Sequence, residues 1–180
     1  MNINTLKKLA EWGFNVPKFV FSPGKHFKRD AIHTLRELFL RSESVCLLAV
    51  REDGVKSKTY DELHIPDAYM RSQALEDSFY TTVIVENVPF DMKGIVVFER
   101  TSGGTIKWTV DNKKYASFCF GYPEAVPDLK LRHVVRECQH VRDRVWKESP
   151  EHFVKVEWRW AVDFMGVNGA RLVIYTYEIA

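Results

Sequence analysis

The order of hydrophobic and polar positions along the chain predicts three helices. Apolar residues recur at three- and four-residue steps in the segments 4–12, 30–40 and 131–146. This spacing is typical of one face of an α-helix. The stretch 56–78 is polar and weakly patterned, so it predicts no regular element.

Short apolar or alternating runs between turn residues predict the strands. They cover 19–21, 45–50, 80–88, 94–99, 105–110, 115–120, 153–164 and 171–179. Because short connections separate the four strands between 80 and 120, we expect these strands to form an antiparallel meander. The last two strands flank a glycine-rich turn at 166–169, which indicates a closing hairpin. The pattern therefore predicts an α+β fold with mostly antiparallel sheets and about three helices.

Length and composition are those of a folded domain. The chain has 180 residues, of which 46% are hydrophobic and 28% are charged, a balance that excludes a disordered chain and allows a sizeable core. We expect a single domain at 1–180. Its N-terminal half of helices and strands would span 1–80, and the antiparallel sheet with its helix and closing hairpin would span 81–180.

Charge and cysteine content limit the partners. A net charge of +2 gives no strong field for sequence-independent binding to nucleic acid, although a local basic patch stays open. The three cysteines are too far apart in sequence for a disulfide framework or a C-x-x-C site. The sequence shows no signal-peptide core and no run near the ~18 apolar residues that cross a bilayer. We expect a cytoplasmic protein with no membrane partner; the oligomeric state is open.

Acidic residues of the closing hairpin are candidate metal ligands. Alternation along 155–163 places Glu157 and Asp163 on one face, and the hairpin could bring Glu178 near Glu157 or Arg159. Two carboxylates beside a cation suit a Mg²⁺ ion that carries nucleotide phosphates. The alternative is a solvated face with ordinary cross-strand ion pairs.

Two cations are candidate phosphate ligands. Arg51 closes the apolar run 45–50, where a guanidinium can grip phosphate oxygens with two hydrogen bonds. Its alternative is a surface turn with an exposed ion pair to Glu52 or Asp53. Lys107 lies in a predicted strand and could face a phosphate or simply water.

A polar pair interrupts the apolar strand that ends at Val88. Glu86 and Asn87 stand within this strand, and the exposed backbone of Glu86, Asn87 and Val88 could pair with the edge of an adenine. The alternative is a plain strand end.

Four stretches of the chain share their pattern with one enzyme family. They are 6–17, 48–51, 83–88 together with 94–98, and 156–163 together with 174–179. In this order they resemble the N-terminal nucleotide-binding region of phosphoenolpyruvate synthase and pyruvate phosphate dikinase, a branch of the ATP-grasp enzymes. The chain is about half as long as that region, and it has no phosphohistidine domain, so the resemblance does not imply phosphorylation of pyruvate by this chain alone.

The resemblance implies ATP and Mg²⁺ as cofactors. Arg51 would touch the ATP phosphates, 86–88 would border adenine, and the closing hairpin would supply metal-binding acids. A serine pair that follows the arginine in the family is replaced here by Glu52 and Asp53. The resemblance implies an ATP-grasp-like nucleotide-binding protein, which could be a phosphoryl-transfer or ligase enzyme or a non-catalytic binder.

Two other functions stay open. The run Arg51-Glu52-Asp53-Gly54 resembles the K-x-D-G motif of polynucleotide ligases, but arginine stays protonated in proteins and cannot replace the lysine nucleophile. A non-enzymatic interaction module is the second alternative. Trp158 and Trp160 would then contact a partner, unless they fill the core.

Overall fold

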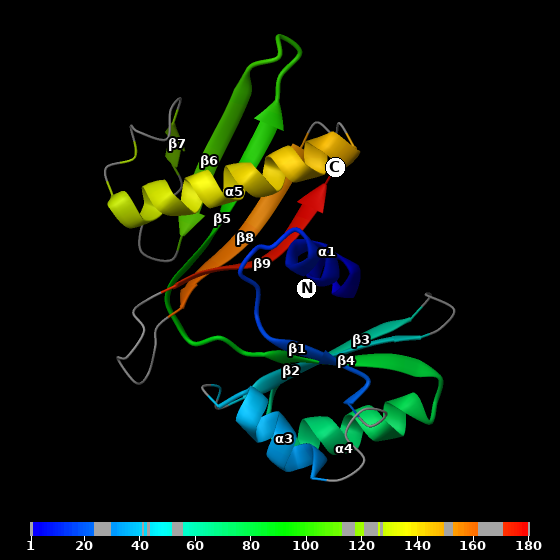
Figure 1. The fold of residues 1–180 in the computed structure, drawn as a ribbon. Coiled ribbons are helices and arrows are strands. Elements are labelled where there is room, and N and C mark those ends of the chain that lie inside the picture. The colour runs from blue at the N-terminus through cyan, green and yellow to red at the C-terminus, as the bar shows by residue number, and fades with distance from the viewer. Residues whose placement is uncertain are drawn as a thin grey trace. The chain divides into compact units, whose positions relative to one another are not determined.

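The chain folds into two compact units, which Figure 1 shows for a computed structural model. The residues described are 2–23, 30–40, 42, 44–51, 56–112, 118–120, 126, 128–149, 153–161 and 171–179. Unit 1 combines Met1–Val16 with Phe90–Ala180, and unit 2 is Pro17–Pro89. Each unit contains one antiparallel sheet with helices on it, which confirms the predicted α+β class.

Unit 2 is a four-stranded sheet with two helices. The strand order is β1-β4-β2-β3, formed by β1 (Phe19–Phe21), β2 (Val45–Arg51), β3 (Ser57–Leu63) and β4 (Tyr80–Glu86). Helices α3 (Ala31–Leu38) and α4 (Ile65–Glu76) contribute to one core with the sheet. Alternate residues of β2, namely Val45, Leu47 and Ala49, point into this core.

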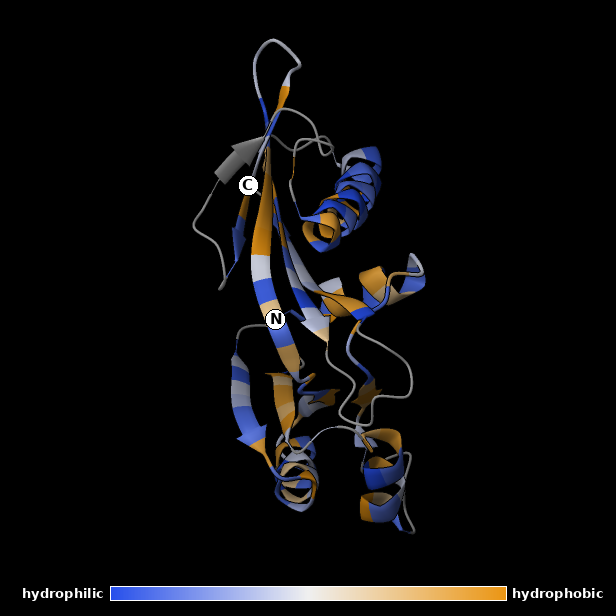
Figure 2. Ribbon diagram, turned by 90° about the vertical axis from the view of Figure 1, so that its left-hand side faces the viewer, coloured by the Kyte–Doolittle hydropathy of each residue, from blue (hydrophilic) through white to orange (hydrophobic). Residues whose placement is uncertain are grey.

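Unit 1 is a five-stranded sheet with two helices on the same side (Figure 2). The strand order is β7-β6-β5-β8-β9. The strands are β5 (Phe90–Arg100), β6 (Ile106–Asn112), β7 (Phe118–Phe120), β8 (Phe153–Ala161) and β9 (Arg171–Ile179). The helices are α1 (Ile3–Glu11) and α5 (Leu129–Glu148), and both contribute side chains to one core.

Helix α5 closes one face of this sheet. The Asp128 carboxylate caps the helix by accepting hydrogen bonds from the backbone N–H groups of Lys130 at 2.8 Å and Leu131 at 3.3 Å. The buried stripe of the helix comprises Leu131, Val134, Val135, Cys138, Val141 and Val145. It packs against sheet residues that include Val96, Phe98, Val156 and Trp158. Burial of each such side chain contributes about 1.5–3 kcal/mol before the entropic cost of ordering it.

The three predicted helices are confirmed as α1, α3 and α5, whereas α4 and β3 were not predicted. Helix α4 buries small or polar residues such as Ala68 and Ser72, so it shows no strong apolar stripe in the sequence. Strand β3 lies at the edge of its sheet and exposes most of its side chains, so it shows no clear alternation.

The predicted meander is wrong in its first strand. Strands β5, β6 and β7 pair consecutively, but β4 pairs with β1 and β2 in the other sheet. A short connection suggests that the two strands it joins form a hairpin. Here the short segment 87–89 instead connects β4, which belongs to unit 2, with β5, which belongs to unit 1. Unit 1 unites both ends of the chain, whereas the halves expected from the sequence were 1–80 and 81–180.

Among the residues described, no helix is long and apolar enough to span a membrane.

A substitution at Gly94 on β5 tests the close approach of β6 to this glycine. An added Cβ would collide with the backbone oxygen of Asp111 and lie 2.7 Å from the Cβ of Asn112. Because a central strand cannot shift cheaply, we expect Gly94→Ala to lower the free energy of unfolding in urea by about 1–3 kcal/mol. Gly103→Ala is the matched control, since its nearest neighbour is the Thr105 hydroxyl at 3.6 Å. Equal stabilities of the two variants would contradict this packing.

Candidate functional site

The face of the unit 1 sheet opposite α1 and α5 carries charged side chains. On β8, Trp158 is buried in the core, so alternation turns its neighbours Glu157 and Arg159 to the other face. The register places Lys93 of β5 directly opposite Arg159. Asp111 of β6 lies opposite Ile95, which in turn lies opposite Glu157. Folding therefore gathers charges from three strands on this face.

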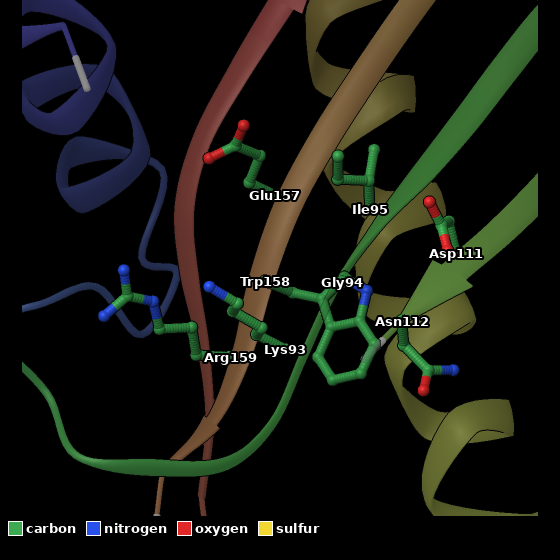
Figure 3. A pocket seen from close by; sticks show the side chains of 8 residues that line it. All are labelled: Lys93, Gly94, Ile95, Asp111, Asn112, Glu157, Trp158 and Arg159. Carbon is green, nitrogen blue, oxygen red and sulfur yellow. The ribbon is translucent and has the colours of Figure 1, made fainter. Parts of the chain in front are cut away.

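A pocket of about 400 Å³ lies at these residues (Figure 3). Its lining is formed by Lys93, Gly94, Ile95, Asp111, Asn112, Glu157, Trp158 and Arg159. In Figure 3 the side chains of Lys93, Glu157 and Arg159 extend in the same direction from their strands. The pocket thus combines two cations with two carboxylates, those of Asp111 and Glu157.

Aromatic rings hold the two cations of the pocket. The guanidinium carbon of Arg159 lies 3.8 Å from the ring centroid of Tyr175 and 4.7 Å from that of Phe90. Its Nη1 donates a hydrogen bond to the Tyr175 hydroxyl at 3.0 Å. The Nζ atom of Lys93 lies 5.2 Å from the Phe90 ring centroid. Such cation–π contacts fix the positions of charged groups at a modest gain in energy.

Lys155 links the two acids of the closing hairpin. Its Nζ atom lies 3.1 Å from Oε2 of Glu178 and 3.6 Å from Oε1 of Glu157. A register shift between Glu157 and Trp158 places Glu178 opposite Lys155 and Glu157 opposite Thr176. The hydrogen bond to Glu178 raises the pKa of Lys155 above its ordinary value.

The predicted metal ligands are brought together only in part. Glu157 and Glu178 meet at Lys155, whereas Asp163 lies outside the described residues. Within the part of the chain that the structure describes, no three His, Cys, Asp or Glu residues are grouped to hold a metal ion. Two carboxylates suffice in number for a Mg²⁺ ion that also binds phosphates. The ammonium group of Lys155 already contacts both, so the arrangement does not fit Mg²⁺ as it stands.

Lys107 shares the charged face of unit 1 but not the pocket. It lies on β6 opposite Glu99 and is exposed. Alternation places it on the same face as Asp111, which is four residues further along β6. Strand β5 lies between Lys107 on β6 and Glu157 on β8.

Arg51 and Glu86 lie at opposite ends of the ladder that joins β2 and β4 in unit 2. Val45 is opposite Glu86, and Arg51 is opposite Tyr80. Six residues of extended strand span about 20 Å, so the structure does not bring Arg51 and Glu86 together. Arg51 is exposed at the end of β2, where its backbone N–H donates to the Lys56 carbonyl at 2.9 Å.

The run from Glu86 to Val88 is fixed within unit 2. The Glu86 carboxylate, on a residue only 3% exposed, accepts a hydrogen bond from the backbone N–H of Lys18 at 3.1 Å. The backbone N–H of Glu86 donates to the Lys18 carbonyl at 2.8 Å. Asn87 donates from Nδ2 to the hydroxyl of Ser44 at 2.9 Å, and Val88 is buried. These contacts give the strand end a defined position.

The sequence did not single out Lys93 or Arg159 as site residues. The alternation along β8 marked Arg159 as a neighbour of the acids, but the partner of Lys93 follows only from the register of β5 and β8. Trp158 lies in the core and Trp160 packs against it, as expected if these tryptophans are structural. The residues 52–54 of the K-x-D-G-like run lie outside the described part of the chain.

Comparison with solved structures shows the fold of the chain. It superimposes over 98% of its length on D-alanyl-alanine synthetase A from Vibrio cholerae, with a TM-score of 0.52 and 9% identity. It is also similar over 97% of its length to the macrocyclase MdnC from Microcystis aeruginosa bound to its precursor peptide MdnA, with a TM-score of 0.52 and 11% identity. A third similar structure is N5-carboxyaminoimidazole synthetase from Staphylococcus aureus complexed with ADP, matched over 97% of this chain with a TM-score of 0.53 and 10% identity.

The chain spans only 56%, 49% and 42% of the lengths of these three proteins, respectively. No family model matches the sequence, and no curated protein matches it either. The similarity confirms an ATP-grasp-like α+β fold.

The raised pKa of Lys155 predicts a pH dependence of stability. Because the folded-state pKa lies above the ordinary value of 10.5, the ion pairs of Lys155 stabilise the protein below that pH and are lost as the pH rises through the folded-state pKa. At about pH 9 we expect wild type to exceed Lys155→Met in free energy of unfolding by about 0.2–1 kcal/mol, the usual size for partly exposed pairs. The difference should shrink towards about pH 12 in urea unfolding.

Lys147→Met is the control for this measurement, because Lys147 is an exposed residue in the last turn of α5. It removes the same charge on the other side of the sheet. A difference between wild type and Lys155→Met that stays constant across this pH range would contradict the assignment.

Proposed function

We propose that the chain binds an adenine nucleotide, ATP or ADP, with its phosphates on the charged face of unit 1. The observation that carries the proposal is the pocket whose lining includes Lys93 and Arg159. The ATP-grasp-like fold supports the choice of ligand, since one of the similar structures is described as complexed with ADP.

Lys93 and Arg159 are the proposed phosphate ligands. Arg159 offers a planar set of N–H donors that matches phosphate oxygens, and Lys93 adds a point charge opposite it in the register. Their contacts with Phe90 and Tyr175 position both charges before a ligand arrives, which lowers the entropic cost of binding. Arg51 stays a candidate phosphate ligand through the family resemblance, and Lys107 stays one as a cation on a strand of unit 1.

The run Glu86 to Val88 of unit 2 stays a candidate border of adenine through the family resemblance. The resemblance alone assigns it this role, since the backbone N–H groups of Glu86 and Asn87 already donate to the carbonyls of Lys18 and Ser44. A site that reads the donor and acceptor pattern of adenine should bind ATP and ADP more tightly than CTP or UTP. Equal affinity for all four nucleotides would remove this part of the proposal.

Nucleotide binding is common to an enzyme and to a non-catalytic binder of this fold. Positioned cations that neutralise phosphate charge are what phosphoryl transfer or acyl-phosphate formation requires of a protein. We therefore propose that the chain binds a nucleotide. Phosphoryl transfer and ligation are the reaction classes that such a site could serve.

A thermal unfolding titration with ATP and ADP tests the proposal. A ligand at about 100 times its dissociation constant adds about 2.7 kcal/mol to the free energy of unfolding, so the midpoint should rise by several degrees. An unchanged midpoint at millimolar ATP and ADP would refute nucleotide binding.

Lys93→Met tests the position of the phosphates. Methionine keeps the apolar stem and removes the charge, so we expect the dissociation constant for ATP to rise about 10-fold or more in calorimetry, since hydrogen bonds to charged groups contribute about 1.5–3 kcal/mol. Lys147→Met should bind ATP like wild type. Unchanged affinity in Lys93→Met would place the phosphates elsewhere.

A further inference from the structure

The two acids of the closing hairpin share an internal cation. The Nζ atom of Lys155 lies within ion-pair distance of both Glu157 and Glu178. Their side chains are 40% and 59% exposed, respectively, and that of Lys155 is 26% exposed. The least exposed of the three side chains is therefore that of Lys155, whose ammonium joins the other two.

Among the residues that the structure describes, charged side chains of both signs lie in and beside the pocket. Asp111, Glu157 and Glu178 supply three negative charges on this face. Lys93, Arg159 and Lys155 supply three positive ones. A divalent cation in a phosphate site neutralises phosphate charge and lies between the phosphate oxygens and the carboxylates that bind it. Here Lys155 offsets the two carboxylates, and Lys93 and Arg159 line the pocket in which the phosphates are proposed to bind.

The geometry at Lys155 suits an ammonium group and opposes Mg²⁺. The ion requires oxygen ligands at about 2.0–2.1 Å in near-octahedral order and gives up its water reluctantly. To bind both Glu157 and Glu178 it would have to displace the ammonium from both acids. It would then lie next to that unpaired positive charge, so Mg²⁺ competes with Lys155 for the same carboxylates.

We propose that Lys155 takes the place of a divalent cation at Glu157 and Glu178, so that this face binds nucleotide phosphates without a metal ion. The inference rests on the nucleotide binding proposed above and specifies its ionic requirement. It reassigns the two acids from metal ligands to partners of a built-in ammonium.

Calorimetric titration of the full chain with ATP, in EDTA and in millimolar Mg²⁺, tests the inference. For wild type, the dissociation constants in the two buffers should agree within about threefold. For Lys155→Met, the constant in EDTA should rise about 10-fold or more, because the carboxylates then repel the phosphates. Added Mg²⁺ should restore most of that loss, since the two acids are free to bind it. Lys147→Met should behave like wild type in both buffers.

The outcomes separate this inference from nucleotide binding itself. Wild-type binding of ATP only in Mg²⁺ would overturn the role of Lys155 and leave nucleotide binding standing. Equal affinity of wild type and Lys155→Met in EDTA would overturn it as well. Absence of ATP binding by wild type in both buffers would refute nucleotide binding, and the inference with it.

Glu178→Gln keeps the inference testable if Lys155→Met fails to fold. This variant retains the ammonium and removes one carboxylate, so metal-free ATP should bind as tightly as to wild type or more tightly. At least a 10-fold loss in EDTA would show that the acid itself supports binding, and it would overturn the proposal.

Discussion

The packing of the apolar stripe of α5 against β5 and β8 is the interaction on which the rest of unit 1 depends. Val134, Val135 and Cys138 meet Val96 and Trp158 in a core from which water is excluded. Because strand side chains alternate, burial of one set fixes the direction of the other. The charged face is the consequence of this burial, and a slip of one residue would send its cations into the core.

Register then decides which charges meet on that face. Lys93 faces Arg159 across β5 and β8, and the shift after Glu157 brings Glu178 beside Lys155. Oppositely charged neighbours on adjacent strands offset one another. The face can therefore carry a dense set of charges at little cost to stability. Aromatic contacts with Phe90 and Tyr175 also hold Arg159 in place.

Much of the fold could be predicted because its strongest elements carry strong local signals. The stripe of α5 and the apolar run of β2 are visible in the sequence, whereas α4 buries Ala68 and Ser72 and gives no such stripe. The partners of β4 could not be predicted, since an apolar strand fits any sheet that buries both its faces. The same limit applies to the site. The predicted hairpin brought Glu178 near Glu157, but only the register reveals Lys93 opposite Arg159.

A crystal structure of the chain with a non-hydrolysable ATP analogue would test the account most directly. The account predicts phosphate oxygens within hydrogen-bond distance of Lys93 and Arg159, with Lys155 still between Glu157 and Glu178. Phosphates bound away from the charged face of unit 1, or a metal ion in place of the Lys155 ammonium, would contradict it.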